Sequence, residues 1–177
     1  MSAGIRAGAS NDGYLQVNGI DVLKLESNGR VKQVIAQPAF RLSLAAAQIL
    51  TSAVEAPVLW DTVELNIAGA YSAGTGRWTP TVPGWYQINA AARSGGGAVY
   101  SSVAMSIYQN TTIVSRIGQL NVAGVGSCGL AGGSLVHLNG TTDYIVFQAI
   151  CVTSSGTPQV DGNVSLCNMS GFLVRSD

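Results

Sequence analysis

The chain has 177 residues, of which 47% are hydrophobic and only 10% are charged, and its formal net charge is zero. This length suits one domain with a sizeable core and a small additional piece. The Lys and Arg residues are scattered rather than clustered, which argues against binding to a nucleic-acid backbone. Charged residues commonly make up about a quarter to a third of a soluble monomer's surface. We therefore expect that part of this chain's surface is buried between subunits, which would explain its low share of charged residues.

The N-terminal residues predict an arm followed by a small β-meander. Residues Met1 to Asp12 are small and polar, and we expect a flexible or extended arm that becomes ordered against a partner. Asn18-Gly19 predicts a tight hairpin, and Ser27-Asn28-Gly29 predicts a second turn. A meander this short buries too little apolar surface to be stable alone, so we expect three copies to wind together.

Pro38 marks the end of this first piece, because proline biases the residue before it towards an extended conformation. We therefore predict two domains, residues 1–37 and residues 38–177. The first residues contain no apolar core of a secretory signal, and no run is long enough to span a bilayer. We expect assembly in a cytosol without membrane insertion.

A central stretch, residues 60–92, has two alternating runs separated by small residues, which is the pattern of antiparallel strands. Its spaced positions are Trp60, Asn66, Tyr71, Trp78, Gly84, Tyr86 and Ile88. This spacing resembles the signature of the globular head of complement subcomponent q, a tumour-necrosis-factor-like jelly roll. The family usually has Phe at 60, 78 and 88 and an aromatic residue at Ala90, but every replacement here is apolar.

A second match lies near the end of the chain, where Asn168 to Val174 resembles the family's terminal Ser-Gly-Phe-Leu-Leu strand. The two matches bracket about residues 38–175. We therefore predict an all-β protein, a two-sheet antiparallel jelly-roll sandwich preceded by a small N-terminal β-hairpin arm. The resemblance implies a homotrimer. It also favours loop and short strand over helix for residues 45–56, where the alanines alone allow a helix.

The strand predicted at residues 143–152 is apolar on both faces. Ile145, Phe147, Ala149 and Cys151 form one face, and Tyr144, Val146, Ile150 and Val152 form the other. A sandwich strand has one inward face, so the second must be buried elsewhere. We predict that Tyr144, Val146, Ile150 and Val152 lie at the trimer interface. The Asn139-Gly140 pair before this strand predicts a hairpin.

No catalytic constellation is recognisable, and we predict a non-enzymatic protein without a cofactor. His137 is the single histidine and lies among leucine and valine, which favours a structural, hydrogen-bonded role. Residues 124–129 fit a dinucleotide fingerprint, but strand rather than helix is predicted after them.

Asp143 and Asp161 lie near loops and are candidates for binding a cation, because some relatives bind calcium near the trimer axis. Solvated loop carboxylates are the better interpretation of these two residues.

The sequence contains an odd number of cysteines, which does not suit a complete disulfide framework. They are Cys128, Cys151 and Cys167. We predict buried free thiols, with a Cys151–Cys167 cross-strand bridge as the alternative.

If the head binds a ligand, its loops are the expected location. The candidate residues are Tyr71, Arg77, Trp85, Arg93 and Tyr100, which we expect to be exposed aromatic or Arg positions. Tyr71 belongs to the family signature and is alternatively a core residue.

The meander also carries a functional indication. Its Tyr-Leu-Gln-Val-Asn-Gly run and the later Ser-Asn-Gly resemble pieces that recur in bacteriophage tail-fibre and other virion proteins. We expect a virion structural protein assembled in the host cytoplasm: a trimeric fibre or spike tip, attached through residues 1–35 to a capsid or tail protein. Its head would bind a host-surface glycan or protein. The alternatives are a capsid decoration (cement) protein and a secreted complement-like lectin.

Overall fold

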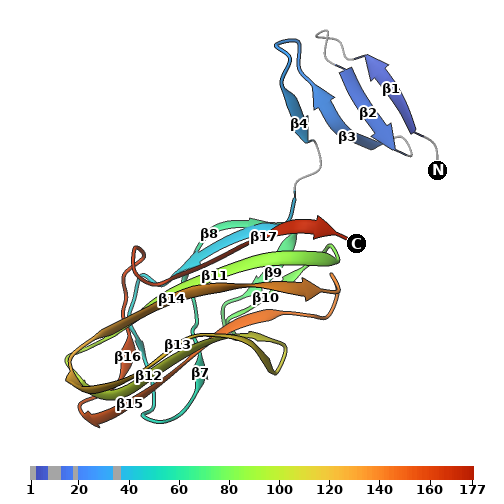
Figure 1. The fold of residues 1–177 in the computed structure, drawn as a ribbon. Helices are drawn as coiled ribbons and strands as arrows, with labels where there is room; N and C mark the ends of the chain where they lie inside the picture. The colour runs from blue at the N-terminus through green and yellow to red at the C-terminus, as the bar shows by residue number, and fades with distance from the viewer. Residues whose placement is uncertain (1–2, 8–12, 18–19, 34–36) are drawn as a thin grey trace. The chain divides into compact units, whose positions relative to one another are not determined.

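The computed structural model in Figure 1 describes residues 3–7, 13–17, 20–33 and 37–177. The chain divides into two compact units, Met1–Gln37 and Pro38–Asp177. All regular elements within the described ranges are β-strands. None of the described segments is a helix with the length and apolar character needed to cross a membrane.

The N-terminal unit is a four-stranded antiparallel sheet with the strands in chain order. These are β1 (Ala3–Ala7), β2 (Gly13–Val17), β3 (Ile20–Leu25) and β4 (Val31–Gln33). Residues 3–7 are extended, as one of the two expected alternatives has it, but they are ordered within the chain itself, because they satisfy their backbone groups by pairing along the whole of β2. The turn predicted at Ser27 to Gly29 is confirmed: the Gly29 N–H donates to the Glu26 carbonyl at 2.9 Å, and Gly29 has a φ of 82°. The predicted Asn18-Gly19 hairpin lies outside the described residues.

The second unit consists of two antiparallel sheets (Figure 1), so the predicted sandwich is confirmed. One is a seven-stranded sheet in the order β6-β16-β11-β17-β5-β8, with β14 also paired to β11. Its strands are β5 (Ala39–Ser43), β6 (Gln48–Ile49), β8 (Thr62–Ile67), β11 (Gly84–Gly95), β14 (Cys128–Leu138), β16 (Gln159–Val160) and β17 (Asn168–Ser176).

The other is a six-stranded sheet in the order β13-β12-β15-β10-β9, with β7 also paired to β15. Its strands are β7 (Ala56–Pro57), β9 (Gly69–Ser72), β10 (Arg77–Pro80), β12 (Val99–Gln109), β13 (Thr112–Val125) and β15 (Ile145–Ser155). Residues 45–56 form loop and short strands rather than helix, as expected.

The core between the sheets is organised around Trp78, a residue of the family signature that is fully buried. Its ring centroid lies 4.3 Å from that of Phe40 and 5.6 Å from that of Tyr86. Its Nε1–H donates to Asn66 Oδ1 at 3.1 Å, which satisfies the only polar atom of the indole. A Cβ at Gly69 would lie 2.6 Å from the indole, so the small residue is required there. The signature residues that carry the resemblance are therefore packing residues.

Two further glycines are required by close packing. Gly84 has a φ of 150°, and a Cβ there would collide with the Arg175 carbonyl oxygen. Gly171, in the terminal strand that resembles the family, has Phe40 and Ile88 directly above it: an added Cβ would lie 2.5 Å from Phe40 Cε1 and 2.7 Å from Ile88 Cδ1.

The hairpin predicted at Asn139-Gly140 is wrong. These residues join β14 of the seven-stranded sheet to β15 of the six-stranded sheet, so they carry the chain from one layer to the other. The Asn139 side-chain oxygen accepts hydrogen bonds from the backbone N–H groups of residues 141, 142 and 143. Asn-Gly favours a tight turn, but the turn alone does not decide whether the flanking strands pair.

Candidate functional site

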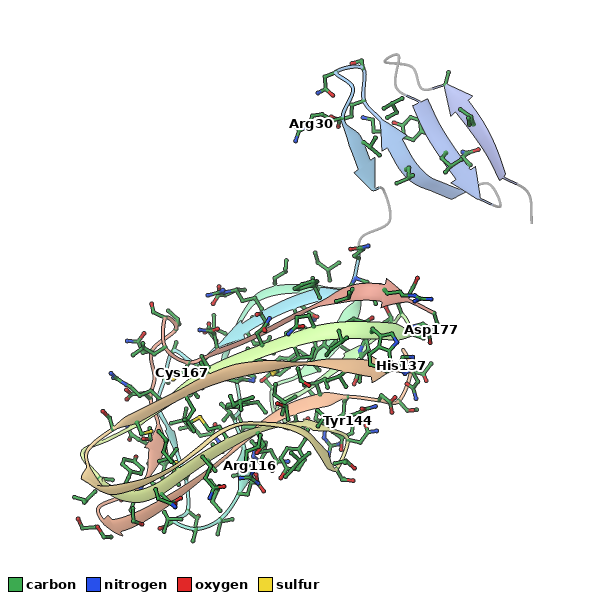
Figure 2. The ribbon with its side chains drawn as sticks, viewed as in Figure 1. Arg30, Arg116, His137, Tyr144, Cys167 and Asp177 are labelled. Atoms are coloured by element: carbon green, nitrogen blue, oxygen red, sulfur yellow. The ribbon has the colours of Figure 1, made fainter. Side chains whose placement is uncertain are left out.

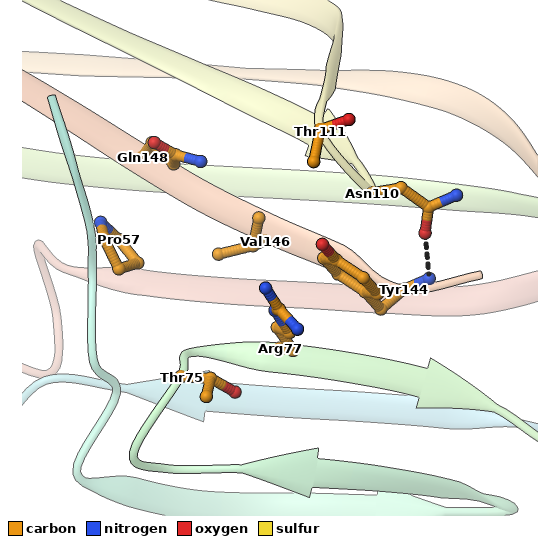
Figure 3. A pocket seen from close by; sticks show the side chains of 8 residues that line it. All are labelled: Pro57, Thr75, Arg77, Asn110, Thr111, Tyr144, Val146 and Gln148. Atoms are coloured by element: carbon orange, nitrogen blue, oxygen red, sulfur yellow. Dashed lines mark hydrogen bonds between the residues drawn. The ribbon is translucent and has the colours of Figure 1, made fainter. Parts of the chain in front are cut away.

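A hollow of about 270 Å³ lies on the outward side of the six-stranded sheet, and Figure 3 shows the side chains around it. We call it the Arg77 pocket. Its lining residues are Pro57, Thr75, Arg77, Asn110, Thr111, Tyr144, Val146 and Gln148. They come from four separate parts of the chain, which strand pairing brings together.

The turn between β9 and β10 positions Arg77. The Gly76 N–H donates to the Ser72 carbonyl at 2.8 Å. Gly76 has a φ of 68°, and a Cβ there would lie 2.6 Å from the Val58 carbonyl oxygen, so glycine is required. Arg77 follows as the first residue of β10, where it pairs with Val146 of β15. The start of this strand is thereby held against the floor of the pocket.

The Arg77 guanidinium stacks on an aromatic ring. Its central carbon lies 4.1 Å from the centroid of Tyr144, within the range of a cation–π contact. Within the described ranges, Arg77 forms no ion pair and its side chain makes no hydrogen bond. The pocket therefore presents a guanidinium whose N–H donors are available.

Asn110 holds Tyr144 in place from the turn between β12 and β13. Its backbone N–H donates to the Tyr144 carbonyl at 2.9 Å, and its Oδ1 accepts the Tyr144 N–H at 3.1 Å (Figure 3). Its Nδ2 donates to Asp143 Oδ1 at 2.8 Å. Asn110 adopts a left-handed φ of 55°, which asparagine tolerates better than most residues. This rim of the pocket is preorganised by the protein itself.

The other predicted ligand-binding residues lie outside this pocket. Trp85 is exposed on the seven-stranded sheet, with its ring centroid 5.4 Å from that of His137. The Arg93 Nε donates to Asp161 Oδ2 at 2.6 Å, so this guanidinium already has a counter-ion. The Tyr71 hydroxyl donates to the Trp60 carbonyl at 2.8 Å and the ring packs against the core, which is the alternative that the sequence left open.

The expected exposure of Tyr100 is wrong, because its side chain is 0% exposed. Its hydroxyl donates to the Gly95 carbonyl at 2.5 Å. The cause is a bulge in β12: Tyr100 pairs with Thr153 while Ser102 pairs with Val152, so one extra residue is inserted between them. An insertion of one residue inverts the alternation, which turns Tyr100 towards the core.

The four predicted interface residues lie on or beside the outward side of β15, and their place at a subunit interface stays a prediction. Val146 is only 4% exposed and forms part of the pocket floor. Tyr144, Ile150 and Val152 are half-buried. This side of the strand is therefore largely covered within one chain.

A more exposed apolar surface lies on the outward side of the seven-stranded sheet, and sequence reasoning missed it. We call it the apolar face, and its large side chains are Trp85 (43% exposed), Leu135 (51%), Phe172 (50%) and Val174 (54%). Gln87 pairs with Phe172 on one side and Leu135 on the other, so these side chains lie in one row. The signal was present in β17, where Phe172, Leu173 and Val174 are three consecutive apolar residues, so that apolar side chains point to both sides of the strand.

His137 lies at one edge of the apolar face, and its Nε2 is 3.0 Å from both carboxylate oxygens of Asp177 (Figure 2). This agrees with the predicted hydrogen-bonded role.

The carboxylate of Asp143 contacts protein donors, Asn110 Nδ2 and the Asn139 N–H. Within the described ranges, no three His, Cys, Asp or Glu residues are grouped so as to hold a metal ion.

All three cysteines are buried and free, as predicted, and the alternative Cys151–Cys167 bridge is not formed. Burial raises the pKa of Cys151 to about 11 and also raises the pKa of Cys128 and of Cys167. These thiols are therefore small packing groups, not nucleophiles.

Comparison with known proteins agrees with this architecture. A family model for the C1q domain matches residues 39–174. Among solved structures, the globular domain of zebrafish complement 1qA is similar, with a TM-score of 0.57 and 18% identity over 80% of this chain and 100% of that chain. Murine APRIL at pH 5.0 is also similar, with a TM-score of 0.56 and 9% identity over 78% of this chain and 100% of that chain. Eiger TNF from S. frugiperda has a TM-score of 0.55 and 9% identity over 80% of this chain and 94% of that chain. No curated protein sequence matches significantly.

Proposed function

Because this chain belongs to the C1q-domain family, we propose that residues 38–177 form the head of a non-enzymatic, homotrimeric appendage of a bacteriophage particle. The apolar face is the observation that carries the self-association. Soluble monomers rarely expose contiguous apolar surfaces without an interaction to cover them. A second copy is the partner that the composition favours, since only 10% of the residues are charged.

The N-terminal unit supports a separate attachment role. Its sheet exposes Ile5, Leu15, Leu23, Leu25 and Val31, which surround an apolar hollow of about 320 Å³. A sheet of this size with an uncovered apolar face requires a partner for stability. In a trimer the three linked units share a high effective concentration, which favours their mutual packing.

We propose that residues 1–35 join the trimer to a capsid or tail protein, and that the head binds a host-surface glycan or protein. The resemblance of the meander to virion proteins supports this location. The Arg77 pocket supports the binding role, since it presents a cation without a counter-ion among the described residues.

Cryo-electron microscopy of particles from the same genome tests the proposal. Density for trimers at the tail or on projecting fibres is the expected result. Trimers on the capsid lattice would instead identify a decoration protein and refute host binding. A chain lacking residues 1–35 should still form soluble trimers yet fail to join particles, and loss of trimers in that variant would place the assembly determinant in the N-terminal unit.

A further inference from the structure

We propose that the Arg77 pocket binds a sugar ring that carries a carboxylate, such as a uronic acid. This assignment rests on the proposed function of the head in host-surface binding and names the chemical class of its ligand. Three properties of the pocket support it: its single available cation, its neutral hydrogen-bonding groups and its size.

The charge of the pocket selects an anion. Arg77 is the single charged residue among the eight lining residues. Asp143 is next to Tyr144 in the sequence, but its carboxylate accepts hydrogen bonds from Asn110 Nδ2 and the Asn139 N–H. Tyr144 covers one face of the guanidinium and leaves its N–H edge for a ligand. A planar guanidinium matches a carboxylate through two parallel hydrogen bonds.

The remaining lining groups suit the body of a sugar. The Gln148 amide and the Thr111 hydroxyl have no hydrogen-bond partner within the described part of the chain, and both donate and accept. Val146 and Pro57 supply an apolar wall for the C–H groups of a ring. A single guanidinium is too little charge for a polysulfated chain, whose binding needs several cations along its length.

The volume favours a small ligand. At about 270 Å³ the pocket lies just below the range of about 300–1,000 Å³ typical of small-molecule sites. One ring therefore fits better than an extended oligosaccharide. The rim is held by the Asn110 hydrogen bonds, so binding orders few additional groups.

The test uses the full chain and two probes that differ only at one carbon: methyl β-D-glucuronide and methyl β-D-glucoside. Saturation-transfer NMR should show binding of the glucuronide, with the glucoside at least about 10-fold weaker. Arg77→Gln should weaken glucuronide binding by about 10- to 100-fold, the range for loss of a charge-assisted hydrogen bond. Arg77→Lys keeps the charge but not the planar fork, and should bind more weakly than the wild type and more tightly than Arg77→Gln.

Arg116→Gln is the matched control, because Arg116 is an exposed residue of the same sheet and the charge change is identical. It should bind the glucuronide as the wild type does. Equal binding by wild type and Arg77→Gln would overturn the proposal, as would equal binding of the two probes. Complete displacement of the glucuronide by an equal concentration of acetate would show recognition of a carboxylate alone and refute the sugar assignment.

Failure of this inference is distinguishable from failure of the proposed function. If particles carry the trimers but the glucuronide does not bind, the ligand assignment alone is wrong. If particles lack the protein, the virion role is wrong, whereas glucuronide binding by the isolated chain remains measurable.

Discussion

Phe172→Asp should dissociate the proposed trimer, because it places a carboxylate among the exposed apolar side chains of the apolar face. Phe172 is 50% exposed in the isolated chain and lies beside Gln87, in the same row as Leu135. Its backbone already pairs on both sides in β17, so the substitution changes the surface without removing a core residue.

The expected loss of trimer stability follows from the exposed fraction of the Phe172 side chain. Full burial of a phenylalanine contributes roughly 1.5–3 kcal/mol, so covering the exposed half contributes about 1 kcal/mol per subunit. Three subunits give about 3 kcal/mol, which corresponds to about a 100-fold change in the dissociation constant. Burying three unpaired carboxylates would destabilise the trimer of the variant further, since each carboxylate loses its hydration. Both effects shift the proposed trimer towards monomers.

Light scattering coupled to size-exclusion chromatography distinguishes the states, because the trimer has three times the 18.2 kDa mass of one chain. Val54→Asp is the matched control, since Val54 is also 50% exposed but lies in the loop between β6 and β7. Ile150→Asp tests the rival interface on β15. A trimeric Phe172→Asp together with a monomeric Ile150→Asp would refute the apolar face and support the six-stranded sheet.

Three further predictions concern the core. Gly171→Ala should lower the free energy of unfolding by about 1–3 kcal/mol, because the new Cβ would press on Phe40 and Ile88; an unchanged urea midpoint would contradict this packing. The three buried thiols should react with Ellman's reagent only after unfolding, and immediate labelling of the native chain would show that one is accessible. Raising the pH should destabilise the fold, because burial raises the pKa of Cys151 from 9.0 to about 11 and that of Tyr86 from 10.0 to about 12. The unfolded chain loses these protons first, so stability present below pH 9 is lost as the pH rises through 11 and 12; guanidinium midpoints that stay constant over this range would contradict the assignment.

The candidate site was only partly predictable. The sequence predicts Arg77 as a binding residue because it is an arginine in a predicted loop of the head, where binding residues are common. Alternation instead predicts an interface position for Tyr144, because it places this residue on the second apolar face of its strand. Its contact with Arg77 depends on the pairing of β10 with β15 and on the Asn110 hydrogen bonds. Residues so far apart in the chain meet only through tertiary pairing.

The sequence by itself determined the sandwich and its core. Alternating runs predicted the strands, and four of the spaced signature residues lie in the buried core: Trp60, Trp78, Tyr86 and Ile88. The tertiary structure decided which apolar sides are covered and where the chain changes sheets. The physical reason is that a period of two assigns residues to opposite sides of a strand but does not identify the strand's neighbours. One bulge then turned Tyr100 inward, and one turn at Asn139 carried the chain to the opposite layer.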